Sequence, residues 1–112
     1  MMIEKTVYHY LGQSFPAFME IPESFPDKPF VVIEKLPGGG KENHINSSRI
    51  AVQSYGSTLF EAAVLNERVQ ELMENMVELD EVSKVSLNSD YNFTDPTTKR
   101  YRYQAVFDII HY

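Results

Sequence analysis

Residues 29–63 read PFVVIEKLPGGGKENHINSSRIAVQSYGSTLFEAA, and this stretch decides the fold. Residues 30–36 are rich in β-branched and aromatic side chains, which favour a strand, and the Pro-Gly-Gly-Gly break that follows favours a turn. Residues 49–55 alternate between apolar and polar positions, as a strand does in a sheet with one solvated face. The two strands therefore predict a β-hairpin with a long mobile tip.

The segment after the second strand has the pattern of an amphipathic helix. Thr58 followed three residues later by Glu61 predicts a capping box, in which side chains satisfy free amide hydrogens at the helix start. An apolar stripe with the 3.6-residue period then marks the face that enters a core. This stripe consists of Ala62, Leu65, Val69, Leu72, Met73 and Met76. We expect the helix to end near Leu79 and Asp80.

The N-terminal part of the chain predicts one helix and an irregular arm. Apolar residues recur at helical spacing in residues 3–11, and Gly12 is suited to the C-terminal cap of a short helix. Prolines interrupt residues 16–29, so this segment is expected to be an extended arm. Within it, residues 17–21 could form a short edge strand.

The C-terminal part of the chain predicts a second hairpin. Residues 82–93 and 101–112 read as strands, and the turn-forming cluster at residues 94–98 lies between them. The whole order is α-β-β-α-β-β. It predicts an α+β fold in which a short N-terminal helix and one long amphipathic helix pack on a single sheet of four to five mostly antiparallel strands. We expect residues 1–112 to form a single domain.

Composition excludes several classes of site. The chain has no cysteine, which rules out disulfides, thiolate metal sites and a cysteine nucleophile. The formal net charge of −6 argues against a tight nucleic-acid binder, because phosphate affinity depends on clustered lysine and arginine. No apolar run approaches membrane-spanning length, and the polar start lacks the pattern of a signal peptide. We expect a protein that is made in the cytosol and has no membrane partner.

The histidines do not predict a reactive site. His9, His44 and His111 lie far apart in the sequence, and none has a partner at metal-ligand spacing. His44 beside Ser47 or Ser48 could suggest a base and a nucleophile, but neighbouring loop residues rarely supply the geometry of a triad. We therefore interpret these residues as solvated loop polarity and predict no metal, no cofactor and no enzymatic activity.

Three groups of residues are candidates for interaction surfaces instead. The first is an acidic ridge on the long helix, away from the apolar stripe, formed by Glu67, Glu71, Glu74 and Glu78. The second is a basic cluster, Lys99, Arg100 and Arg102, which could complement the ridge within one subunit or across an interface, or could protect an edge strand. The third is a candidate docking loop formed by Gly38, Gly39, Gly40, Lys41, Glu42, Asn43 and His44.

Three features together resemble the tail terminator proteins of long-tailed bacteriophages. These features are the strand at 30–36 with its glycine-rich break, the Arg-Ile-Ala-Val-Gln-Ser-Tyr-Gly-Ser run at 49–57, and the helix that opens with Glu61-Ala62-Ala63. The resemblance implies a non-enzymatic subunit of a hexameric ring that caps the tail tube and joins the tail to the head. It implies as partners other copies of the chain, a tail-tube protein and a head-tail connector protein. It also implies a place in the neck of the virion, with assembly in the bacterial host cytoplasm and DNA passing through the ring without tight binding. In such a ring we expect the acidic ridge and the basic cluster to lie near the contacts between subunits or near the lumen, where acidic residues would repel passing DNA.

Other functions compete with this interpretation. Another head-tail connector or completion protein would have nearly the same sequence properties. A small ligand-binding α+β module would need a pocket between helix and sheet, lined by Tyr8, Tyr101, Tyr103 or Phe107. A hydrolase would need carboxylates or a histidine converging on one cleft, and the spacing does not predict this.

Overall fold

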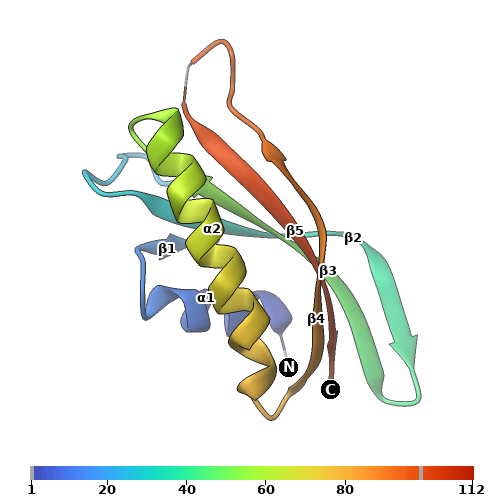
Figure 1. Ribbon diagram of the computed structural model, residues 1–112. Helices are drawn as coiled ribbons and strands as arrows, with labels where there is room; N and C mark the ends of the chain where they lie inside the picture. The colour runs from blue at the N-terminus through green and yellow to red at the C-terminus, as the bar shows by residue number, and fades with distance from the viewer. Residues whose placement is uncertain (1, 99) are drawn as a thin grey trace.

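In the computed structural model, which describes residues 2–98 and 100–112, two α-helices pack on a five-stranded mixed sheet in an α+β arrangement (Figure 1). The elements in chain order are α1 (Ile3–Gly12), β1 (Ala17–Phe18), β2 (Phe30–Glu42), β3 (Ile45–Tyr55), α2 (Leu59–Asn75), a 3₁₀ turn (Met76–Glu78), β4 (Val82–Asn92) and β5 (Arg102–His111). Within the described residues, neither helix is long and apolar enough to cross a membrane.

The strands lie in the order β1-β2-β3-β5-β4. The β2–β3, β3–β5 and β4–β5 pairs are antiparallel, as expected, but β1 pairs with β2 in parallel. The predicted element order therefore needs a correction, because a third strand precedes α2. This strand has only two residues, where residues 17–21 were expected. The segment after it does not rejoin the sheet before β2, and it contains prolines at positions 22, 26 and 29, which lack the amide hydrogen that a ladder requires.

The predicted long tip of the first hairpin is wrong. Strands β2 and β3 continue through it and meet at a tight turn in which Asn43 and His44 have φ angles of 51° and 66°. Two consecutive residues with positive φ are the requirement of a turn whose twist matches that of the flanking strands. Residues 36–47, here called the hairpin arm, project beyond the rest of the sheet at the lower right of Figure 1.

Two glycines make this continuation possible. The β2–β3 register shifts between Leu36 and Gly40, and within this bulge Gly38 and Gly39 have φ angles of 123° and 83°. A Cβ atom on Gly39 would lie 1.9 Å from the carbonyl oxygen of Ser47 in the partner strand. The glycine run therefore builds an irregularity within a strand, where sequence analysis expected a free loop.

The main core lies between the two helices and one face of the sheet. The apolar stripe of α2 is confirmed, with Leu72 only half-buried and its other members buried. From α1, the buried side chains are Ile3, Val7 and Leu11. The buried side chains of both helices form one core cluster with strand residues of β2, β3 and β5. These strand residues are Val31, Ile33, Ile50, Val52, Ala105, Phe107 and Ile109. Because both helices use this one face, the opposite face of the sheet has no helix over it (Figure 1).

The start of α2 is capped as the sequence predicts. The amide of Glu61 donates to Thr58 Oγ1 at 3.1 Å. The Glu61 carboxylate in turn accepts from the backbone amide and the hydroxyl of Ser57, at 3.2 and 2.9 Å. One buried polar residue interrupts the apolar side of the helix: Asn66 donates its side-chain amide to Asp90 of β4. This bond ties the helix to the outer edge of the sheet.

A pair of glycine substitutions tests whether the bulge shapes the hairpin arm. Gly39→Ala should destabilise the arm by about 1 to 3 kcal/mol, because alanine disfavours the positive φ and its Cβ meets backbone. Hydrogen exchange at the amides of Glu42 and Ile45, the pair that closes the two-residue turn, should accelerate accordingly. Gly40→Ala is the control, since a Cβ there has no neighbour within 4 Å. Equal effects of the two substitutions would contradict the bulge.

Candidate functional site

The face of the sheet that lacks a helix, here called the open face, covers itself with side chains. Its central residues are buried although no helix lies over them: Val32, Ala51, Gln53, Gln104 and Val106. Buried amide side chains are costly unless they are hydrogen-bonded. The two glutamines are therefore the informative members of this set.

The glutamines form a polar ladder across four strands. Gln53 Nε2 donates to Gln104 Oε1 at 2.9 Å and to Glu34 Oε2 at 3.3 Å. Gln104 Nε2 then donates to the hydroxyl of Tyr91 on β4. The buried amides of the ladder find their hydrogen-bond partners within the protein. They are therefore not free to bind a ligand on this part of the face.

A second polar row lies closer to the hairpin arm. Arg49 Nε donates to Asp108 Oδ1 at 2.9 Å, and Asn88 Nδ2 donates to Asp108 Oδ2 at 3.0 Å. These hydrogen bonds, with that of Arg49 first, lower the pKa of the Asp108 carboxyl. The Arg49–Asp108 contact is the one ion pair found in the part of the chain that the structure describes.

At the other end of the open face, aromatic rings and two arginines form an arginine patch. Phe30 and Tyr55 stack with ring centroids 4.8 Å apart and planes 4° from parallel. Phe25, from the proline-rich arm, packs edge-on against both rings, with centroids 5.2 and 5.7 Å away. The patch consists of these rings with Phe93, Arg100 and Arg102. Through Phe25, the patch anchors the proline-rich segment between β1 and β2 onto the sheet.

The two arginines are held by this aromatic bed. Arg102 donates to the Tyr55 hydroxyl at 2.8 Å and to the Phe93 carbonyl at 2.6 Å, and its guanidinium lies 4.4 Å from the Phe93 ring centroid. The Arg100 guanidinium lies 4.3 Å from the Phe25 ring centroid. No described carboxylate forms an ion pair with either group. A preorganised pair of guanidinium groups is suited to binding carboxylates or phosphates.

The acidic ridge lies on the other side of the molecule. All four glutamates are exposed, Glu67, Glu71 and Glu74 on α2 and Glu78 on the 3₁₀ turn, and none is within ion-pair distance of a described cation. Because α2 packs on the helix-covered face, the sheet separates the ridge from the arginine patch. Within the described residues, no ion pair joins the ridge to Arg100 or Arg102. Lys99, the third member of the predicted basic cluster, lies outside the described residues.

The candidate docking loop forms the end of β2 and the turn of the hairpin arm. All seven of its residues, from Gly38 to His44, are exposed. They do not approach the arginine patch or the acidic ridge. The structure thus places the three candidate groups on three separate surfaces.

Sequence analysis missed a buried serine–histidine contact. Ser48 Oγ and His111 Nε2 are 2.8 Å apart, and both residues are buried, with 5% and 3% exposure. His111 Nδ1 has no hydrogen-bond partner among the described residues. Burial keeps both atoms from a substrate, and no described residue orients the imidazole as the third member of a triad, so the contact is a hydrogen bond of the core. Only the β3–β5 register brings these residues together, and no local motif indicates it.

The residues considered for a metal site or a ligand pocket do not meet in one cleft of the described structure. No group of three metal-ligating side chains occurs in the described residues. Of the aromatics considered for a ligand pocket, Phe107 lies in the core, whereas Tyr8 lines an open hollow of about 950 Å³ together with residues 17–23. Tyr101 and Tyr103 do not line that hollow.

Comparisons with known proteins do not add to this geometry. No known protein-family model matches the sequence, and no curated protein matches it.

The burial of His111 predicts a pH dependence of stability. Burial lowers the pKa of His111 in the folded protein, whereas in the unfolded chain the imidazole titrates near about 6.5. Below that pH the unfolded chain binds a proton that the folded protein resists. The stability associated with neutral His111 is therefore fully present above about pH 6.5 and declines as the pH falls.

Denaturant titrations at about pH 7.5 and 5.5 measure this effect. We expect the free energy of unfolding to be lower at the acidic pH, and the difference to shrink in His111→Gln, which cannot titrate. Asp108 does not confuse the result, because its lowered pKa confines its own effect to more acidic conditions. An unchanged difference in the variant would assign the pH dependence to other groups.

Proposed function

We propose that this protein is a ring-forming structural subunit of the tail terminator type, which caps a phage tail tube and joins the tail to the head. The observation that carries the proposal is the separation of the exposed acidic ridge from the arginine patch by the sheet. Two complementary surfaces on opposite sides of one chain cannot satisfy each other, but they can meet between copies. A repeated contact of this kind is heterologous, and it generates a ring when the rotation closes.

Charge also suits a ring through which DNA passes. The net charge of −6 gives the assembled ring a negative potential, and this repels phosphate groups. The two arginines that could attract DNA would be covered by the ridge of the neighbouring copy. The protein then resides in the virion neck, with tail-tube protein on one side and connector protein on the other.

The described surfaces fit a structural role better than a catalytic one. The two buried glutamines of the open face bond to each other, and the serine–histidine contact is buried in the core. Exposed charge is instead concentrated on broad surfaces, as assembly requires. A head-tail connector or completion protein is the second candidate, because it would use the same heterologous contact between copies with a different axial partner.

Charge reversal tests the ring. Glu71→Lys combined with Glu74→Lys should weaken self-association by roughly tenfold or more, since it places like charges opposite the arginine patch. Adding Arg100→Glu should restore part of the loss. Light scattering and negative-stain imaging of the purified protein, alone and with tail-tube protein, provide the measurement.

Glu20→Lys combined with Glu23→Lys is the matched control, because it changes the net charge equally at exposed sites between β1 and β2. Normal rings in the Glu71/Glu74 variant, or equal damage in the control, would count against the ridge. Rings that bind connector protein but not tube protein would favour the second candidate. A strict monomer in the presence of both partners would reject the proposed function.

A further inference from the structure

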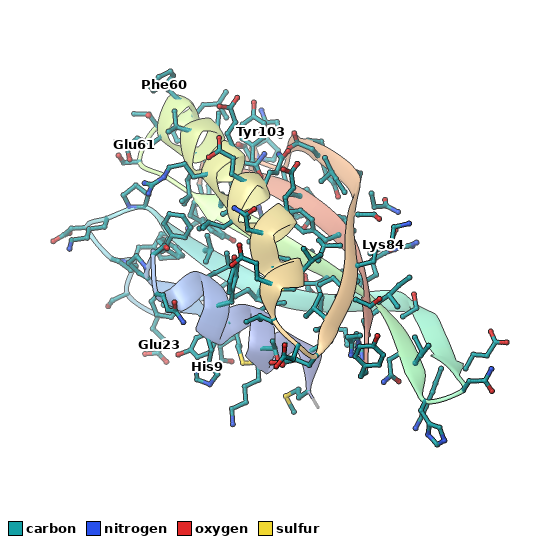
Figure 2. The ribbon with its side chains drawn as sticks, turned by 60° about the horizontal axis from the view of Figure 1, so that its bottom comes forward. His9, Glu23, Phe60, Glu61, Lys84 and Tyr103 are labelled. Atoms are coloured by element: carbon teal, nitrogen blue, oxygen red, sulfur yellow. The ribbon has the colours of Figure 1, made fainter. Side chains whose placement is uncertain are left out.

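An apolar groove lies beside the first turns of α2 and carries no assigned role. It has a volume of about 370 Å³, and Phe15, Pro16, Pro29, Phe60, Val64 and Leu65 contribute its apolar lining. Phe60 is 77% exposed, the highest value among the exposed large apolar side chains. Figure 2 shows Phe60 at the outer end of α2. So large an exposed aromatic surface next to a groove is typical of a contact site.

The polar members of the groove give it a positive rim. The Arg68 guanidinium lies 5.1 Å from the Phe15 ring centroid, and Lys28 also lines the groove. Neither cation forms an ion pair with a described carboxylate. Glu61 lines the groove as well, but its carboxylate already accepts two hydrogen bonds from Ser57. The site therefore suits an apolar side chain accompanied by a carboxylate.

The hairpin arm presents this combination at its end. Ile45 is 43% exposed although it is apolar. Its cross-strand partner is Glu42, so the two side chains lie on the same face of the arm. Lys41 and Asn46, the next pair in the ladder, lie on the opposite face.

The arm cannot reach the groove of its own chain. The arm projects at the lower right of Figure 1, whereas α2 begins at the upper left, and Figure 2 shows the same separation. The longest dimension of the molecule is 44 Å. A contact between arm and groove must therefore join two copies.

We infer that the end of the hairpin arm docks into the α2 groove of a second copy, with Ile45 against Phe15, Phe60 and Val64 and with Glu42 facing Lys28 and Arg68. The inference deepens the proposed function and rests on it, because it names a contact between neighbouring subunits of the ring. Each copy donates one arm and receives one, which is a heterologous contact. It also accounts for the exposed apolar side chain of Ile45 beside the turn of the arm.

The chain has no cysteine of its own, so any disulfide must join cysteines introduced by mutation. Cross-linking therefore tests the contact directly. Ile45→Cys combined with Val64→Cys should give a ladder of disulfide-linked oligomers under mild oxidation, ending at the size of the ring. Lys41→Cys combined with Val64→Cys is the control, since Lys41 faces away from the proposed contact. We expect at least roughly tenfold less cross-linked product from the control, which corresponds to about 1.4 kcal/mol at equal reactivity.

A charge exchange tests the same contact without cysteines. Glu42→Lys should weaken self-association, and Glu42→Lys combined with Lys28→Glu should recover it. Rings that form normally but give no specific cross-link, or a double variant no better than Glu42→Lys alone, would overturn the docking inference and leave the proposed function standing. A protein that stays monomeric with tail-tube protein would overturn both.

Discussion

The structure depends on one constraint: its two helices cover only one face of the sheet. The stripe of α2 and the apolar residues of α1 meet the alternating apolar positions of β2, β3 and β5 on that face. The other face must then be closed by its own side chains. It achieves this with the Gln53–Gln104 ladder in the middle and stacked rings of Phe30 and Tyr55 at one end. Burial of unpaired amides would otherwise cost more free energy than a small domain can spare.

This constraint also gives the molecule two unlike sides. The solvent side of α2 carries the acidic ridge, whereas the open face carries Arg100 and Arg102, whose guanidinium groups lie over aromatic rings. The two ends of the molecule also differ. The hairpin arm extends from one end of the sheet, whereas the apolar groove lies at the other end, near the start of α2. A chain with such unlike surfaces is suited to directional contacts with copies of itself.

The features that could be predicted from the sequence are those set by residues close together in the chain. The capping box at Thr58 and the apolar stripe of α2 were predictable, because both depend on residues within a few positions of one another. The strands at β2 and β3 were recognised from their alternation. The hairpin arm was not, because three consecutive glycines are typical of loops, and only the pairing with β3 shows that Gly38 and Gly39 form a bulge.

The surfaces show the same division. Sequence alone determined that this chain has an acidic helix face, a basic cluster and no cysteine, because composition and helical periodicity are local properties. Only the tertiary structure decided that the ridge and Arg102 lie on opposite sides of a sheet, that Ser48 meets His111, and that Ile45 shares a face with Glu42. The reason is physical: strand register and the choice of which sheet face a helix covers are settled by packing between distant segments, and no short stretch of residues encodes either.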